Sequence, residues 1–230
     1  MSVSTDPNIA SGRQMATTAP PKLRFAANGN TPAVLADIFK ENINIAIWER
    51  ALPTTVNSVV TELVAAKSPI NLAITLSREN ALESICSSLG TSPRCALSRD
   101  IALLVDMFCD LLGLNRAALR VRTLDQAMCP KFHVDRVPCR LITTYYGAGT
   151  EWLPHDAVNR SKLGTGSGGL PDTKSGLIKS VDDIEQFSRG DVGLLKGELW
   201  QNNRDAGLVH RSPDVITEDV RVLVSIDVSN

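Results

Sequence analysis

Histidine and aromatic residues are scarce in this chain. Only 3 of its 230 residues are histidines, and aromatic residues make up 4%. No apolar run is long enough to cross a bilayer, and the first residues lack the apolar core of a secretory signal. A formal net charge of -1 and the lack of a basic stripe give nucleic-acid binding no electrostatic support. We therefore expect a protein that binds neither membranes nor nucleic acids.

Regular cysteine patterns are also missing. The five cysteines form no CxxC pair, so a disulfide framework and a four-thiolate zinc site are both unsupported. Reduced thiols in a cytoplasmic protein fit this usage better. The chain has no GxSxG nucleophile motif and no P-loop. Serine hydrolase chemistry and nucleotide binding are therefore not indicated.

Hydrophobic periodicity divides the chain into three parts. Residues 1–30 are rich in Ser, Thr, Ala, Pro and Asn without a period, which predicts a disordered tail. Residues 31–128 mix helical and strand periods, and the clearest helix is predicted to start at a Ser98 cap and to end at Gly113. These residues form an N-terminal mixed α/β segment that we expect to pack on the C-terminal part.

Residues 129–230 have little helical periodicity. Short strand-like runs separated by Gly, Pro, Asp and Asn predict a double-stranded β-helix, or jelly roll, in this part. The expected fold class is therefore α+β, with a C-terminal jelly-roll metal-binding domain. The Gly- and Ser-rich residues 160–176 are long for a structureless loop in a compact domain, which suggests a mobile lid or binding loop.

Two of the three histidines suggest a metal site. His133 and Asp135 are two residues apart, so on an extended strand their side chains share a face, and His210 lies far downstream in LVHRSP. Two imidazoles and one carboxylate leave open positions on a metal, as a non-haem Fe(II) oxygenase requires. In the alternative interpretation the histidines are ordinary strand residues and Asp135 belongs to a turn.

Arg221 is the second chemical signal. It begins the apolar run VRVLVSIDV, where an unpaired charge would be costly. A guanidinium binds a carboxylate through two hydrogen bonds, which suits the distal carboxylate of 2-oxoglutarate. Lys196 is a second candidate cation. The alternative is an outward-facing Arg221 paired with Glu218 or Asp219.

Other residues are weaker candidates. Thr143 and Tyr145 follow the HxD motif on one face of a predicted strand, and a hydroxyl from them is expected to contact the co-substrate. Cross-strand packing is the alternative for both. Trp152 and Arg140 are candidate substrate contacts, although Trp152 also suits a core.

Two cysteines leave a zinc site open. Cys129 and Cys139 flank His133 in sequence, and together the three residues suit a closed, redox-inert Zn²⁺ site. The alternative is a pair of buried strand cysteines.

The order of several segments resembles a known superfamily. HVD, GAGTEWLP, RGDVGLLKG and LVHRSP, followed by an arginine, occur in the order found in 2-oxoglutarate/Fe(II) dioxygenases. This resemblance covers residues 129–228 and implies that His133, Asp135 and His210 bind iron and that Arg221 binds the co-substrate. Leu223 departs from the pattern, because many of these enzymes have a small hydroxylic residue there.

A narrower resemblance covers the chain from about residue 35. The core CPKFHVDRVPCRLITTYYGAGTEWLP is similar to a bacterial family of unknown function. The favoured function is thus an Fe(II)/2-oxoglutarate dioxygenase that hydroxylates an unknown small molecule or protein. One alternative is a non-catalytic zinc- or iron-binding jelly roll involved in metal handling. Another is a barrel that has lost its metal and acts as a binding module.

Overall fold

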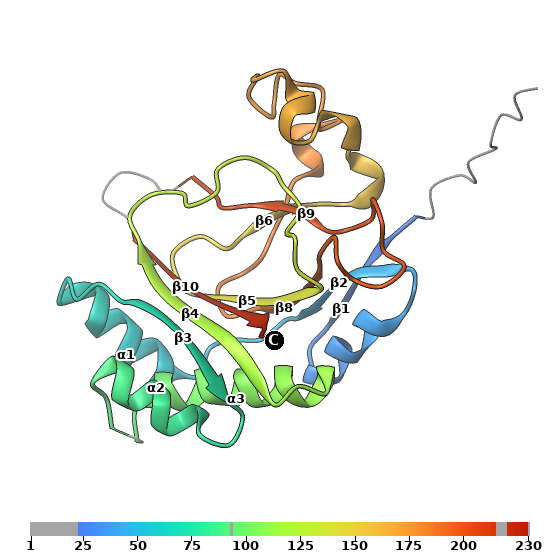
Figure 1. Cartoon of the computed structure of the whole chain (residues 1–230). Helices are drawn as coiled ribbons and strands as arrows, with labels where there is room; N and C mark the ends of the chain where they lie inside the picture. Colours follow the sequence, from blue (N-terminus) through green and yellow to red (C-terminus); the bar gives the residue numbers. More distant parts are fainter. Residues whose placement is uncertain (1–22, 93, 215–219, 230) are drawn as a thin grey trace, which may run out of the picture.

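A large mixed sheet forms the centre of the molecule (Figure 1). The computed structural model describes residues 23–92, 94–214 and 220–229. Neighbouring strands of the sheet are, in order, β1 (Phe25–Gly29), β2 (Ile43–Trp48), β8 (Val192–Lys196), β5 (Cys139–Tyr146), β10 (Arg221–Val228), β4 (Arg116–Leu124) and β3 (Asn71–Ser77).

Both halves of the chain contribute to this sheet. β1 to β4 precede residue 128, and β5, β8 and β10 follow it. β10 pairs antiparallel with β4 on one side and with β5 on the other. The segment 31–128 therefore does more than pack on the C-terminal part, because it completes the same sheet.

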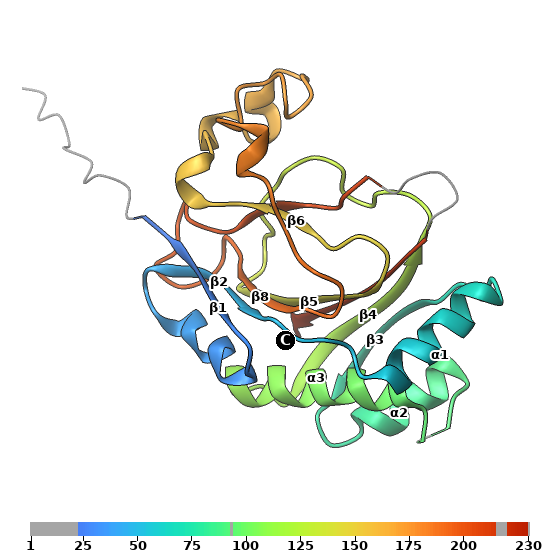
Figure 2. The ribbon, with the colours of Figure 1, turned by 180° about the vertical axis from the view of Figure 1, so that it is seen from behind.

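The large sheet is covered on both faces (Figures 1 and 2). Three α-helices lie against one face, and a small sheet lies over the other. The helices are α1 (Thr54–Ala65), α2 (Ala81–Leu89) and α3 (Ala96–Leu112), and a 3-10 helix, η1, spans Pro32–Phe39. The small sheet has the order β7 (Glu185–Gln186), β6 (Glu151–Leu153) and β9 (Val209–Arg211). The architecture is thus mixed α/β, with few helices.

The alternation of side chains along β10 creates two environments. Val222, Val224 and Ile226 are buried in the main core with the helices. Because neighbouring residues of a strand point to opposite faces, the residues between them face the small sheet. These are Arg221, Leu223, Ser225 and Asp227. A second apolar cluster lies between the sheets and consists of Ile45, Ile47, Ile142, Trp152, Phe187, Leu195 and Leu208.

The C-termini of α2 and α3 lie at the glycines that the sequence indicates as helix ends. Gly90 and Gly113 end α2 and α3 in the left-handed conformation, with φ of 64° at both. The predicted start of α3 at Ser98 is wrong, because the helix begins at Ala96. Ser98 is buried inside the helix, where its hydroxyl bonds with that of Thr91.

Two predicted irregular segments contain structure. The predicted disordered tail, residues 1–30, is too long, because Phe25–Gly29 forms a strand that pairs in parallel with β2. This pairing gives the backbone groups at the edge of β2 a hydrogen-bonding partner. Residues 1–22 lie outside the described part. Residues 160–176, which we expect to form a mobile lid or binding loop, also contain local structure. The chain there turns in 3-10 helices at Arg160–Lys162 and Gly164–Ser167, and the Ser167 hydroxyl donates to the carbonyl of Gly164.

The described residues contain neither a disulfide bond nor a helix suited to span a membrane. All five cysteines are free thiols. Within residues 23–92, 94–214 and 220–229, no helix has both the length and the apolar character needed to span a membrane.

Candidate metal centre

Two histidines from distant parts of the chain are joined by their backbones. His133 lies in the connection between β4 and β5, and His210 is the middle residue of β9. The two residues form an isolated antiparallel bridge, in which each amide donates to the other's carbonyl with N–O distances of 3.0 Å. This bridge sets the spacing of the two imidazoles, whose ring centroids are 4.6 Å apart.

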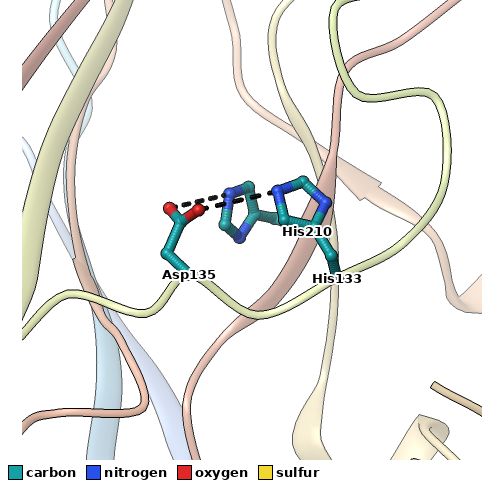
Figure 3. A group of neighbouring side chains, drawn as sticks. All are labelled: His133, Asp135 and His210. Atoms are coloured by element: carbon teal, nitrogen blue, oxygen red, sulfur yellow. Dashed lines mark ion pairs between the residues drawn. The ribbon is translucent and has the colours of Figure 1, made fainter. Parts of the chain in front are cut away.

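Asp135 completes a compact group (Figure 3). Its carboxylate oxygens lie 3.6 Å from Nε2 of His133 and 3.3 Å from Nε2 of His210. One ligand atom from each residue lies within 4.8 Å of the other two. In the described part of the chain this is the one group of three or more such residues close enough to hold a metal ion. The structure thus brings together the three residues that the HxD … His pattern indicates.

The outer nitrogens of both rings contact backbone carbonyls. Nδ1 of His133 lies 2.9 Å from the carbonyl oxygen of Lys131, and Nδ1 of His210 lies 3.3 Å from that of Leu208. A proton on each Nδ1 satisfies these carbonyls and leaves the Nε2 lone pairs directed at the centre. Metal-binding histidines commonly have this arrangement, so the donor set fits a divalent cation.

Asp135 is held in its charged form. Burial alone would raise the pKa of its carboxyl group, but the neighbouring imidazoles of His133 and His210 and the charge of Arg140 outweigh burial and hold the pKa well below its usual range. The Nη1 group of Arg140 donates to Asp135 at 2.7 Å. A permanently ionised carboxylate is ready to bind a cation at neutral pH.

A second carboxylate lies behind Arg140. Asp227, near the end of β10, accepts hydrogen bonds of 2.6 and 2.9 Å from Nε and Nη2 of Arg140. Arg120 of β4 donates to the same carboxylate. Sequence reasoning missed this role of Asp227 and proposed Arg140 only as a weak substrate contact. Strand alternation through Arg221 would have placed Asp227 on the inner face.

Arg221 is a buried cation with no carboxylate partner among the described residues. Its side chain is 2% exposed, and Nη2 donates to the hydroxyls of Thr144 at 3.0 Å and Thr150 at 2.7 Å. Its Nε has no hydrogen-bond partner. Burial therefore lowers the pKa of Arg221 to about 10. The residue is still charged at neutral pH, and the described residues offer it no anion. Glu218 and Asp219, the alternative partners expected from the sequence, lie outside the described residues.

The other residues predicted to contact the co-substrate or substrate lie on two different faces of the large sheet. Thr143 and Tyr145 lie on the opposite face of β5 from Thr144, and Tyr145 belongs to the main core with the helices. The Tyr145 hydroxyl donates to Asp100 of α3 at 2.5 Å. Trp152 instead lies between the sheets, opposite His210 in the register of β6 and β9.

The alternative ligands lie outside the three-residue group. Cys139 is buried in the main core, on the opposite face of β5 from Arg140, and burial raises the pKa of its thiol to about 12. Cys129 is exposed, and its backbone pairs with Ser212. Lys196 is buried and donates to the carbonyl of Lys40 at 2.8 Å. Neither cysteine belongs to the metal-binding group that the described residues form.

Several solved structures are distantly similar. A dioxygenase for auxin oxidation in rice is 13% identical, with 89% of this chain and 82% of that chain covered and a TM-score of 0.47. A prolyl-4-hydroxylase from Pseudomonas putida is 11% identical, with 85% and 96% covered and a TM-score of 0.42. HygX from Streptomyces hygroscopicus, with nickel and 2-oxoglutarate bound, is 12% identical, with 85% of each chain covered and a TM-score of 0.43. These likenesses are distant, so the chemistry of the site rests on its own residues.

A family model covers most of the chain. None of the curated proteins compared with the chain matches it. A model described as a protein of unknown function, DUF1826, matches residues 29–227, which include the whole metal centre and Arg221. The expectation of a family of unknown function is thereby confirmed. The chain belongs to the DUF1826 family of proteins of unknown function.

Proposed function

We propose that the protein is a non-haem Fe(II)/2-oxoglutarate-dependent dioxygenase. In the proposed reaction, 2-oxoglutarate, dioxygen and a substrate C–H bond give succinate, carbon dioxide and a C–OH group. His133, Asp135 and His210 would hold the iron, and the part from residue 129 would act as the jelly-roll domain. When bound, Fe(II) supplies the activation of dioxygen that no side chain of the protein provides.

The donor set supports Fe(II) over a closed structural zinc site. Two imidazoles and one carboxylate fill only one side of a six-coordinate metal. Structural zinc sites instead use four protein ligands and favour thiolates. The nearby thiols Cys129 and Cys139 are not in the group.

Arg221 is the observation that carries the co-substrate assignment. A buried guanidinium without a carboxylate is costly, and a ligand carboxylate would remove that cost. Alternation along β10 places Arg221 on the same face as Asp227, which Arg140 connects to Asp135. Both ends of 2-oxoglutarate would therefore meet partners on one face of the sheet.

Thr144 offers the hydroxyl that the sequence lacks at Leu223. Leu223 occupies the position where the resemblance leads us to expect a hydroxyl, and its partner in the register of β10 and β5 is Thr144. The Thr144 hydroxyl accepts a hydrogen bond from Arg221 and keeps a proton that it can donate to a carboxylate oxygen. The missing hydroxyl is thus supplied from the adjacent strand. We therefore assign the hydroxyl contact to Thr144 in place of Thr143 and Tyr145.

The remaining residues position the reactants and exclude water. Trp152 and Ile142 belong to the apolar cluster between the sheets, where a bound co-substrate would be shielded. Arg140 fixes the orientation of Asp135 through a 2.7 Å hydrogen bond. The protein contributes binding, orientation and an apolar environment.

Anaerobic titration with Fe(II) and 2-oxoglutarate tests this proposal. Chelation of the metal by the keto acid gives a weak visible metal-to-ligand charge-transfer band. We expect the band in the wild type, and we expect Arg221→Gln to require at least about tenfold more 2-oxoglutarate. Arg99→Gln, which removes an exposed arginine from α3, is the matched control and should behave as the wild type does.

Other results would favour the alternatives. Tight zinc binding without a charge-transfer band or succinate release would indicate a metal-handling protein. An unchanged metal content in His210→Ala would contradict the metal site itself.

A further inference from the structure

The large sheet continues beyond the small sheet on the side of β3 and β4 (Figures 1 and 2). On this part, Asn71 and Ala73 of β3 are exposed, and they pair with Arg122 and Arg120 of β4. On the other side of β4, in β10, Leu223 pairs with Arg122 and Ser225 pairs with Arg120. We call Arg120 and Arg122, with the exposed β3 residues Asn71 and Ala73, the arginine shelf.

The arginine shelf is connected to the metal centre by a chain of ion pairs. Arg120 donates to Asp227, Asp227 accepts two hydrogen bonds from Arg140, and Arg140 donates to Asp135. The side chain of Arg120 is 42% exposed, so it contacts Asp227 and solvent at once. The shelf therefore borders the metal centre on the same face of the sheet.

Arg122 has no counter-charge among the described residues. Its side chain forms no hydrogen bond or ion pair with them, and its Nε is buried without an acceptor. A donor removed from water and left unpaired costs free energy, so a ligand that supplies an acceptor is favoured there. Val121 and Thr123, its neighbours in β4, point to the opposite face and offer no acceptor on this one.

The charges on this face do not balance. If Asp135 serves the metal and Arg221 the co-substrate, the charged groups that remain between the shelf and the metal centre are Arg120, Arg122, Arg140 and one carboxylate, Asp227, whereas Arg116 lies at the far, exposed end of β4. Three guanidinium groups thus face a single carboxylate. An anionic ligand would complete this arrangement, and guanidinium matches the geometry of a carboxylate.

We infer that the arginine shelf binds a carboxylate group of the substrate, so that the substrate class is a small carboxylic acid. This inference rests on the proposed function, because the shelf serves catalysis only if the metal centre does. The carboxylate lies between Arg120 and Arg122, and the rest of the molecule extends over Ser225 toward the metal centre. Hydroxylation then occurs at a carbon remote from the carboxylate.

The test uses the metal-free protein and two probes of similar shape, phenylacetate and its neutral amide, phenylacetamide. The Nε–Hε signals of the arginines are followed by NMR at constant ionic strength. We expect phenylacetate to shift the Arg120 and Arg122 signals saturably, with one dissociation constant, and phenylacetamide to leave them in place. In Arg122→Gln, the affinity read at Arg120 should fall about tenfold.

Arg116→Gln is the matched control. It removes one arginine from the same face of β4, at the exposed end of the strand, and should keep the affinity of the wild type. Equal shifts with acid and amide, an equal loss in both variants, or shifts confined to Arg221 would overturn the inference.

The metal-free experiment separates this inference from the proposed function. Neither iron nor 2-oxoglutarate is present, so failure of the charge-transfer test leaves the NMR result unaffected. In the iron- and 2-oxoglutarate-loaded protein, Arg122→Gln should keep the charge-transfer band. Loss of the band in that variant would assign Arg122 to the co-substrate and overturn the shelf as a substrate site.

Discussion

The carboxylate of Asp227 neutralises two arginines, and one of them orients Asp135, a proposed metal ligand. Arg140 forms two hydrogen bonds with Asp227 and one with Asp135, so its position depends on both carboxylates. Partners behind a metal ligand commonly affect affinity, because they fix the orientation of the group that binds. Asp227 is therefore a positioning residue for the metal centre.

Asp227→Asn tests this role. The amide keeps the shape but loses the charge, so Arg140 should hold Asp135 less firmly. We expect the affinity for Fe(II) or Mn(II), measured by calorimetric titration, to fall about tenfold. Asp125→Asn, at an exposed position just after β4, removes the same charge and is the matched control. Equal losses in both variants would point to net charge and would contradict the positioning role.

Thr144 and Thr143 provide a matched pair on opposite faces of one strand. Thr144 accepts a hydrogen bond from Arg221, whereas the buried hydroxyl of Thr143 has no partner. Thr144→Val should lower the free energy of unfolding by about 1 kcal/mol, because Arg221 loses an acceptor. It should also weaken 2-oxoglutarate binding.

Thr143→Val is expected to be neutral or stabilising, because it removes a polar group that already lacks a partner. Urea unfolding and the charge-transfer titration measure the two effects. If Thr143→Val alone weakened co-substrate binding, the hydroxyl contact would belong to Thr143, as the sequence predicts, and not to Thr144.

The three residues of the candidate metal centre could be picked out by residue type, but their supporting contacts could not. His133 and Asp135 share a face by spacing alone, and a scarce third histidine limits the choice of partner. The contact of Asp227 with Arg140 depends on β10 lying next to β5, which no local pattern encodes. The role of Tyr145 depended in the same way on which face of β5 meets the helices.

At the scale of elements, a buried polar cluster connects α3 to the large sheet. Arg50, just after β2, donates to both carboxylate oxygens of Asp100 at 2.9 and 2.8 Å and to the carbonyl of Gly190 at 2.9 Å. Tyr145 of β5 donates to the same carboxylate. The cluster thus fixes the helix relative to two strands and to the turn before β8.

Tyr145→Phe separates a structural role from a role in binding. The variant removes one hydrogen bond from the cluster, so we expect a loss of about 1 kcal/mol in the free energy of unfolding. The affinity for 2-oxoglutarate should not change, because the hydroxyl faces the helical layer. A weaker charge-transfer titration with unchanged stability would reverse this assignment.

Element types were predictable where the periodic signal was strong. Strands such as β2 and β10 follow runs of Ile and Val, and the ends of α2 and α3 follow from glycines. The start of α3 was misplaced because Ser98, a good capping residue, is used inside the helix to bond Thr91. β1 was missed because its pairing with β2, and not its composition, makes it a strand.

At the scale of the whole molecule, the metal centre fastens together segments that are far apart in sequence. The connection that contains His133 and Asp135 meets β9 through the bridge of His133 with His210. A ligand that binds the folded state alone stabilises it in proportion to the logarithm of its concentration over its dissociation constant.

Metal binding should therefore raise the melting temperature. At a hundredfold excess over the dissociation constant the gain is about 2.7 kcal/mol, or roughly 5–10 °C for a chain of this size. Calorimetry with and without Mn(II) measures the shift, and a chelator should reverse it. His210→Ala should show no metal-dependent shift. A rise of the same size in that variant would place the metal elsewhere.

The position of β10 has a consequence for how the protein is made. β10 lies between β5 and β4, and it carries both Arg221 and Asp227. Until residue 228 has left the ribosome, β4 and β5 have no common neighbour, and the strands already synthesised form two incomplete groups with open edges. The sheet therefore cannot close, and Asp227 cannot support Arg140 behind the candidate metal centre, before β10 has been synthesised.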